Sequence, residues 1–365
     1  MTATPVEPPT SQPAASEPRP VDAGPLDAGP LDAGGADPRP AGPTVADLTE
    51  DELIASFVPL LPVGRRTLVP TGDDCAVIEA PDGRFCVSTD VLVEGHHFRR
   101  DWGTAADVGW RAAMQNLADV AGMGAEPTTM VVSLVLPTTT PVAWVHDFSR
   151  GLAQACGPHG VGVDGGDLSA GEEIVVAVTV HGDLGGRAPV LRSGARAGDV
   201  VAHCGQLGRG AAGNALLAAG LRDADEALVA DFLRPRPPLE AGPAAARAGA
   251  TAMMDVSDGL LRDSGRLARR SGVVLDLDPL EASSPGALEA LADAAARLGA
   301  DAREWVLTGG EDHGMLATFP AGAALPQGFR PLGRVRAPED AHPAGTVLVG
   351  GQIPDLVSTG WDHFR

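Results

Sequence analysis

The sequence of 365 residues contains no lysine and no tyrosine, so its 27 permanently charged basic residues are all arginine. The absence of lysine excludes a Walker-A phosphate-binding lysine, a pyridoxal Schiff base and a lysine general base. If this protein handles phosphate groups, metal ions and arginine side chains must therefore supply the positive charge.

Long apolar runs and paired cysteines are also missing. No apolar stretch approaches the length of a membrane span, and the N-terminus lacks the basic and apolar regions of a secretion signal, so we expect a soluble cytoplasmic protein. The widely spaced cysteines Cys75, Cys86, Cys156 and Cys204 form no CxxC pair, which predicts free thiols. The formal charge of −21 argues against nucleic acid as a partner, and it fits both an ordinary acidic protein and one that binds divalent cations.

Composition and periodicity divide the chain into three parts. Residues 1–45 are rich in Pro, Ala, Gly and Asp and include the repeat "DAGPLDAGPLDAGG", which predicts a disordered tail. From residue 46 onward, β-branched strands alternate with helical patterns, which indicates an α/β fold of two domains. The segment "GGRAPVLRSGARAGD" interrupts this pattern and places the boundary near residue 186. We therefore expect domains over 46–186 and 187–365.

Each domain has its own expected elements. In the first domain, the predicted strands are "RFCVSTDVLV", "TTMVVSLVLP" and "EEIVVAVTVHGDL", with helices over 105–122 and 141–156. In the second domain, the predicted strands are "DVVAHCG", "VVLDLD" and "HGMLATF", with helices near 209–220, 223–233, 239–248, 258–271 and 286–298. An earlier helix should follow Thr49, which is a suitable N-cap.

Seven aspartates stand at the ends of apolar strands or inside an apolar helix. They are Asp73, Asp74, Asp90, Asp119, Asp167, Asp255 and Asp258. Any one of them alone is typical of a turn or an N-cap, and Asp255 or Asp258 could cap a helix that starts at Gly259. Together, as hard oxygen ligands with few histidines among them, they favour Mg²⁺ or Ca²⁺ over zinc. Several Mg²⁺ ions shared among scattered aspartates would form a phosphoryl-transfer site.

Asp119 gives the clearest signal for a ligand. The helix over 105–122 is apolar nearly all round, which predicts a buried helix. A buried carboxylate is costly unless it is paired or binds a metal, and no basic residue lies one turn away from Asp119. A metal ion or a basic partner from elsewhere in the fold is therefore needed.

Four further segments have two interpretations each. The glycines of "GVDGGD" and "SDGLL" would let the backbone approach a phosphate, or they form ordinary turns. In "GHHF" at 95–98, one histidine contacts a ligand phosphate, or both are loop residues. In "LTGGEDHGML" at 307–316, Glu311 points at a ligand, or Glu311 and Asp312 are a solvated pair in a tight turn.

Eight segments, taken in order, resemble the thiamine-monophosphate kinase family over residues 46–365. They are "GDDCAVI", "STDVLVEGHHF", "NLADVAGMGAEP", "GGD", "RSGARAGD", "DVSDGLLRD", "LTGGED" and "GWDHF". The resemblance implies a two-domain fold like that of aminoimidazole-ribonucleotide synthetase, without a P-loop, that dimerises through the sheet of its N-terminal domain. It also implies direct in-line transfer of phosphate from ATP to thiamine monophosphate, giving thiamine diphosphate. The alternatives are another ATP-dependent synthetase of this superfamily, or a non-catalytic nucleotide- or metal-binding protein.

The same resemblance assigns residues. The implied ligands of several Mg²⁺ ions are Asp74, Ser88, Thr89, Asp90, Asp119, Asp167, Asp255 and, for a further ion, Asp258. The implied ATP contacts are Gly166, Asp167, Arg192 and Ser257, and the implied substrate contacts are His97, Glu311, Trp361 and Phe364. No dedicated catalytic base is implied, and Asp73 would support its loop. The sequence departs from the family where His159 is the only ring shortly before "GGD", and where His313 replaces a tyrosine.

Overall fold

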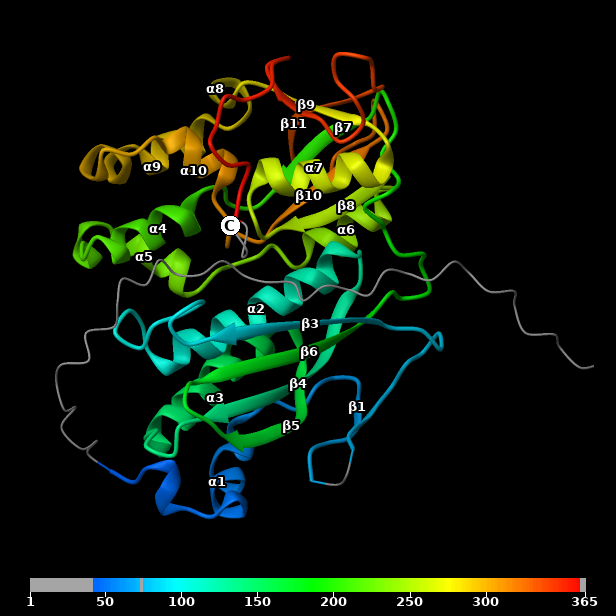
Figure 1. Cartoon of the computed structure of the whole chain (residues 1–365). Coiled ribbons are helices and arrows are strands. Elements are labelled where there is room, and N and C mark those ends of the chain that lie inside the picture. Colours follow the sequence, from blue (N-terminus) through cyan, green and yellow to red (C-terminus); the bar gives the residue numbers. More distant parts are fainter. Residues whose placement is uncertain (1–41, 73–74, 362–365) are drawn as a thin grey trace, which may run out of the picture.

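The computed structural model describes residues 42–72 and 75–361, and these residues form two sheets with helices packed against them (Figure 1). The predicted two-domain α/β fold is confirmed. Asp73, Asp74, Phe364 and most of the predicted tail lie outside the described residues.

The N-terminal sheet has four strands in the order β3-β6-β4-β5. They are β3 (Cys86–Val93), β4 (Glu126–Leu136), β5 (Gly162–Ala170) and β6 (Val175–Asp183). β6 pairs antiparallel with β3 and β4, and β5 pairs parallel with β4. A small sheet of β1 (Thr67–Val69) and β2 (Val77–Ile78) precedes it.

Helices α2 (Ala105–Gly122) and α3 (Val142–Cys156) pack on one another, and α2 also contacts β3, β4 and β6. α2 begins at a capping box in which the Thr104 hydroxyl accepts from the Asp107 amide. The cap expected at Thr49 is also present, since Thr49 and Glu52 form a capping box at the start of α1 (Glu50–Phe57). The local sequence thus fixes where both helices begin.

The C-terminal sheet has six strands in the order β12-β9-β11-β7-β10-β8. They are β7 (Val200–Cys204), β8 (Ala252–Val256), β9 (Val274–Leu277), β10 (Gly314–Phe319), β11 (Arg330–Arg336) and β12 (Val347–Val349). Only the outer pair β12-β9 is parallel. The helices of this domain are α4 (Arg209–Ala218), α5 (Glu226–Leu233), α6 (Ala241–Arg247), α7 (Leu260–Ser271), α8 (Leu280–Ser283), α9 (Pro285–Leu298) and α10 (Ala302–Thr308).

The glycine-rich segment "GVDGGD", for which either a backbone contact to phosphate or an ordinary turn was expected, is the start of strand β5. A Cβ atom on Gly166 would lie 1.9 Å from the carbonyl oxygen of Val132 on β4, so only glycine allows the two strands to approach here. The pairing of β4 and β5 also shifts register between Met130 and Val132. The glycines therefore serve close strand packing, which the sequence pattern alone does not distinguish from a phosphate loop.

α2 lies between the two sheets (Figure 1). One core cluster joins residues of the N-terminal sheet with Ala202 of β7 and Met315 of β10, so the two domains share apolar packing. A second cluster lies between the C-terminal sheet and helices α4, α5 and α7. In the described part of the chain, no helix is both long and apolar enough to cross a membrane.

Candidate active site

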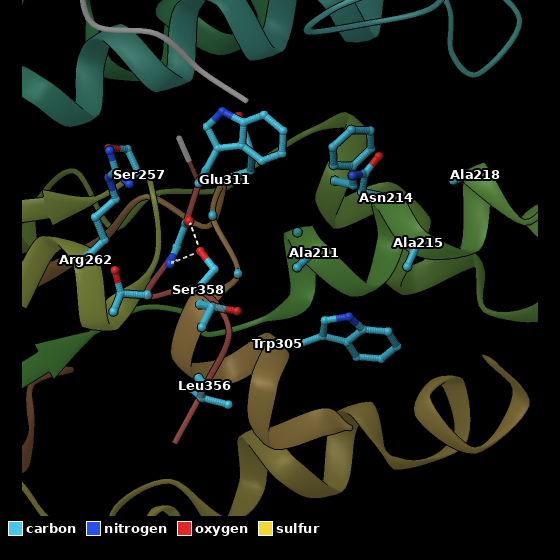
Figure 2. A pocket seen from close by; sticks show the side chains of 18 of the residues that line it. Ala211, Asn214, Ala215, Ala218, Ser257, Arg262, Trp305, Glu311, Leu356 and Ser358 are labelled. Carbon is cyan, nitrogen blue, oxygen red and sulfur yellow. Dashed lines mark hydrogen bonds between the residues drawn. The ribbon is translucent and has the colours of Figure 1, made fainter. Parts of the chain in front are cut away.

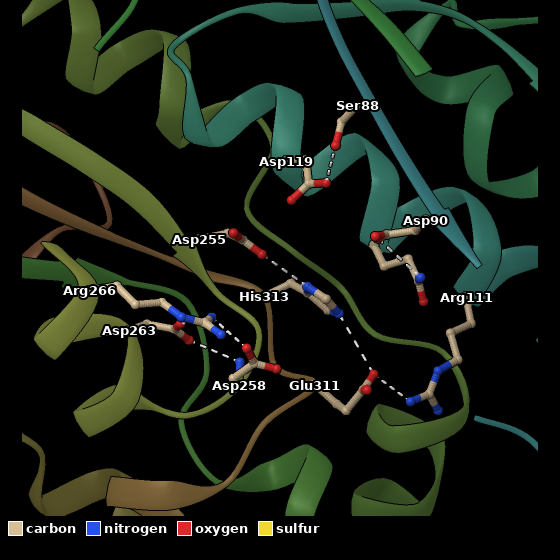
Figure 3. A network of polar contacts seen from close by, with 11 residues as sticks. Ser88, Asp90, Arg111, Asp119, Asp255, Asp258, Asp263, Arg266, Glu311 and His313 are labelled. Carbon is tan, nitrogen blue, oxygen red and sulfur yellow. Dashed lines mark hydrogen bonds and ion pairs between the residues drawn. The ribbon is translucent and has the colours of Figure 1, made fainter. Parts of the chain in front are cut away.

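One face of α2 carries the polar residues that begin the site. Arg111, Gln115 and Asp119 are spaced four residues apart, so they lie along one stripe of a helix that is otherwise almost entirely apolar. Gln115 and Asp119 contact residues of β3, whereas Arg111 contacts Glu311 in the loop before β10 (Figure 3). Asp119 was predicted from the sequence and Arg111 and Gln115 were not, although polar residues at this spacing in an apolar helix are visible in the sequence.

β3 presents two of the predicted ligands to this stripe. The Ser88 hydroxyl donates to Asp119 Oδ2 at 2.6 Å, and the Gln115 amide donates to Asp90 Oδ2 at 3.2 Å. Because side chains alternate along a strand, Thr89 lies on the opposite face of β3, where it accepts a hydrogen bond of 3.2 Å from Thr179. The structure therefore brings Ser88, Asp90 and Asp119 together and leaves the Thr89 side chain apart.

Asp255 approaches the same region from the C-terminal domain. It stands near the end of the fully buried strand β8, with 3% of its surface exposed. His313 Nδ1 lies 3.2 Å from Asp255 Oδ2. The alternative that Asp255 or Asp258 caps a helix is wrong, because α7 begins at Leu260 with Gly259 as its N-cap.

The loop between α10 and β10 supplies Glu311, Asp312 and His313. Glu311 and His313 adopt φ angles of 73° and 51°, which are uncommon for residues other than glycine and show that the backbone of this loop is strained. Glu311 forms an ion pair with Arg111 of α2, and its carboxylate lies 3.8 Å from His313 Nε2. Asp312 is buried and accepts from the amides of Gly208 and Gly210. The interpretation as a solvated acidic pair is therefore wrong.

The carboxylates of this network affect one another's protonation. Burial raises the pKa of Asp90 to about 6, where His313 opposes the rise and Asp255 adds to it. Burial also raises the pKa of Asp119 well above its usual value, and the charges of Asp255 and Asp90 raise it further. Their negative charge is thus only partly compensated, which favours a bound cation.

His313 and Glu311 are held in their charged forms. Burial alone would lower the pKa of His313, but its hydrogen bonds to Asp255 and Glu311 raise it to about 10. Burial alone would raise the pKa of Glu311, but the charge of Arg111 and the hydrogen bond with His313 lower it to about 2. An imidazolium and a guanidinium therefore flank the Glu311 carboxylate.

Asp258 and Asp263 form a second acidic group, which lies beside the first group of Asp90, Asp119 and Asp255 (Figure 3). Arg266 of α7 pairs with both Asp258 and Asp263, and the Asp258 amide donates to Asp263 Oδ2 at 2.9 Å (Figure 3). Asp263 is completely buried, and burial followed by the charge of Asp258 raises its pKa to about 7. Burial also raises the pKa of Asp258, against the opposing charge of Arg266.

A hard divalent cation suits the first acidic group chemically, because Ser88, Asp90 and Asp119 offer it hydroxyl and carboxylate oxygens. Over residues 42–72 and 75–361, however, no three His, Cys, Asp or Glu side chains gather closely enough to hold one metal ion. Asp74, the predicted ligand in the opening motif, lies outside the described residues.

A cavity of about 850 Å³ opens next to the network, and its lining includes Ser257, Glu311 and Trp361 (Figure 2). The structure therefore brings one predicted ATP contact and two predicted substrate contacts to one cavity. His97 is buried in a turn after β3, where its Nδ1 accepts from the Val93 amide at 2.8 Å, and it lies close enough to Glu311 to influence the pKa of that carboxyl group. "GHHF" is thus a turn close to the network.

Three predicted residues lie away from this cavity. Gly166 and Asp167 are exposed on β5, at the sheet edge opposite β3, and line a separate apolar pocket with Phe57 and Phe148. Arg192 is exposed on the loop between β6 and β7, and its carbonyl accepts from the Ser271 hydroxyl.

The two domains correspond to known sequence families. Residues 72–184 match "AIR synthase related protein, N-terminal domain", and residues 196–323 match "AIR synthase related protein, C-terminal domain". The fold and the site thus define an AIR synthase related protein of two domains.

Individual relatives show to which family within this class the chain belongs. The thiamine-monophosphate kinase of Mycobacterium tuberculosis is 47% identical over 305 residues, which cover 82% of this chain and 88% of that protein. The crystal structure of thiamine monophosphate kinase from Aquifex aeolicus is 33% identical with a TM-score of 0.67, covering 78% of this chain and 92% of that one. A structure described as "AaThiL complexed with AMPPCP and TMP" is 34% identical with a TM-score of 0.69, covering 80% and 91%. The chain belongs to the thiamine-monophosphate kinase family.

Proposed function

We propose that this protein transfers the terminal phosphate of ATP to thiamine monophosphate and so forms thiamine diphosphate. The observation that carries the proposal is that Glu311 and Ser257 line one cavity at the edge of the interdomain carboxylate network. In addition, the homologous protein described above was solved with AMPPCP and TMP, a nucleotide analogue and the phosphorylated acceptor.

The transfer requires little acid–base chemistry from the chain. The acceptor is a phosphate oxygen that is already ionised near neutral pH, so no strong general base is needed. The obstacle is the repulsion between two anionic phosphates. The chain's task is therefore to hold the two phosphates in line and to exclude competing water, and the cavity wall formed by Ser257, Glu311 and Trp361 suits the acceptor.

We propose Asp74, Ser88, Thr89, Asp90, Asp119, Asp167, Asp255 and Asp258 as the residues that hold Mg²⁺. Support comes from the raised pKa values of Asp90 and Asp119, because carboxylates that repel one another gain most from a shared cation. When bound, Mg²⁺ would neutralise phosphate charge during transfer. Thr89 would have to contribute through its backbone, since its side chain faces away from Asp119.

We further propose that ATP contacts Gly166, Asp167, Arg192 and Ser257, with the base in the apolar pocket beside Asp167. Phe57, Phe148 and Leu152 line that pocket together with Gly166 and Asp167. His159, the ring that precedes "GGD" in the sequence, does not line this pocket, and its Nδ1 lies 3.9 Å from Glu240 Oε1. The half-buried Phe57, with Ile54 and Val58 beside it, thus offers the apolar surface that a purine base requires.

We also propose a homodimer formed through the N-terminal sheet. The face of β3 turned away from α2 exposes Val87 and Val91, with 58% and 39% of their surface accessible. Apolar side chains of this kind on one sheet face are typical of an interface. Asp90 and Asp167 stand on opposite edge strands of this sheet, so three interstrand spacings, roughly 14 Å, separate them within one copy. A second copy packed on the sheet would give each of these carboxylates new neighbours from the other subunit.

Turnover is tested by incubating the purified protein with ATP, Mg²⁺ and thiamine monophosphate and measuring thiamine diphosphate, with free thiamine as the control acceptor. Formation of thiamine diphosphate from the monophosphate alone supports the proposal. ATP consumption only with another acceptor of the superfamily, or none with any acceptor, contradicts it.

A further inference from the structure

The 850 Å³ cavity has two chemically different ends. One end carries the polar residues Ser257, Arg262 and Glu311 beside the carboxylate network, whereas the other is formed by helices α4 and α10. An acceptor whose phosphate reaches the network must place its opposite end between these two helices. The second end is therefore where an acceptor's ring system would be selected.

α4 lines its end of the cavity with small side chains and one amide. Ala211, Ala215 and Ala218 repeat at intervals of three or four residues, so they form one smooth face of the helix, with Asn214 beside them (Figure 2). No larger side chain of α4 fills the space above this face. The geometry leaves room for a flat ring against the alanines.

Asn214 Oδ1 is buried, and among the residues that the structure describes it has no hydrogen-bond partner. A buried polar atom without a partner costs free energy, roughly 1–3 kcal/mol, unless a ligand or water satisfies it. Because this atom belongs to a residue that lines the cavity, a donor on a bound ligand is a natural partner.

Trp305 of α10 supplies an aromatic surface across from α4, as Figure 2 shows. Its position relative to Asn214 is fixed by the backbone: a Cβ atom on Gly208, at the start of α4, would lie 2.8 Å from the Trp305 carbonyl carbon. Trp305 also accepts a 2.9 Å hydrogen bond from the Gly309 amide at the end of α10. The two helices are thus in close contact, and the ring and the amide face the same space.

We propose that Asn214 and Trp305 recognise the aminopyrimidine ring of the acceptor, an inference that rests on the proposed function. An aminopyrimidine presents an N–H donor next to a ring nitrogen acceptor. The side-chain amide of asparagine matches that edge with two parallel hydrogen bonds, as it does with adenine. Trp305 stacks on the face of the ring, which any flat heteroaromatic group satisfies. Asn214 therefore sets specificity, and Trp305 contributes general affinity.

The test is equilibrium binding, measured by calorimetry, of thiamine monophosphate and of an analogue that lacks the pyrimidine amino group. The parent protein should bind the analogue about 10- to 100-fold more weakly. Asn214→Leu, which is similar in size, should weaken binding of thiamine monophosphate by a comparable factor and bind the two compounds equally. Ala219→Leu, at the exposed C-cap that follows the same helix and outside the cavity lining, is the matched control and should behave as the parent.

Trp305→Ala should weaken both compounds by the same factor, about tenfold, because stacking does not depend on the amino group. Trp305→Phe should restore part of this affinity. The inference is overturned if Asn214→Leu still distinguishes the two compounds, or if its affinity for thiamine monophosphate stays within twofold of the parent.

Turnover is assayed separately, so the two conclusions fail independently. A parent protein that binds thiamine monophosphate with the stated pattern but forms no thiamine diphosphate overturns the proposed function and supports the assignment of Asn214. A parent that forms thiamine diphosphate without any Asn214 effect does the reverse.

Discussion

Asp258 and Asp263 share one guanidinium, that of Arg266. By contrast, within the part of the chain that the structure describes, Asp90 and Asp119 receive hydrogen bonds only from the neutral donors Gln115 and Ser88. Both groups are acidic and largely withdrawn from solvent, yet only the Asp258 group contains its own permanent cation. The difference indicates separate roles. The chain has completed the charge balance around Asp263 by itself, and has left that around Asp119 to be completed by a ligand.

The largest expected effect is on Asp119. Asp119→Asn should lower thiamine diphosphate formation about a hundredfold or more, because it removes a charged ligand from the transfer site. The melting temperature should be unchanged or higher, since repulsion from Asp90 and Asp255 is relieved. Asp293→Asn, at an exposed position of α9, is the control. A variant that turns over at the parent rate under saturating Mg²⁺ would show that Asp119 is not a ligand.

Arg266 should show the opposite pattern, with a loss of stability. Arg266→Met leaves two buried carboxylates without their cation and should lower the free energy of unfolding by about 3 kcal/mol, measured by denaturant titration. Adding Asp263→Asn should recover much of that loss. Arg270→Met, on the exposed side of the same helix, is the matched control. If the double variant is no more stable than Arg266→Met, the shared cation is not what stabilises this group.

The hydrogen bond from Ser88 to Asp119 should have an intermediate effect, on the rate of transfer. Ser88→Ala removes the 2.6 Å hydrogen bond that orients Asp119 and should reduce kcat about tenfold, with the KM for ATP affected less. Ser283→Ala, at a half-buried position of α8 where the hydroxyl donates to the Pro279 carbonyl and not to a residue of the network, should leave kcat unchanged. A normal kcat in Ser88→Ala would mean that Asp119 is positioned by α2 alone.

The smallest expected effect is on the pH dependence of the melting temperature. It arises from His313 and should be measured in the metal-free protein. The folded pKa of His313, about 10, lies above the usual 6.5, so its contribution to stability is fully present below about 6.5 and is lost as pH rises through about 10. Between these values the melting temperature of the parent should fall more steeply with pH than that of His313→Gln. Equal slopes in both proteins would indicate that His313 is neutral in the folded state.

The sequence predicted those features whose physical cost is local. Asp119 stood out because a carboxylate in an apolar helix needs a partner, and the structure supplies one in Ser88. The cap at Thr49 was confirmed because a capping box depends on four consecutive residues. His97 and the "GGED" loop lie close to the network, although the contacts they make there were not predictable from the sequence.

Features that depend on contacts between distant segments were missed. Arg111 pairs with Glu311, 200 residues further along the chain, and no local sequence pattern around Arg111 indicates that partner. Asp263 resembles an ordinary surface residue of α7, yet the packing of its helix buries it completely. β5 was missed because its glycines serve the close approach to β4, a requirement visible only once the two strands are paired.

Asp312 has a consequence for protein engineering. Its carboxylate binds the amides of Gly208 and Gly210 at the start of α4, so the helix that carries Asn214 and the loop that carries Glu311 behave as a single part. Exchanging either segment alone with a homologue would separate the carboxylate from the turn it fits. Chimeras intended to alter acceptor choice should therefore transplant residues 206–219 together with residues 309–313.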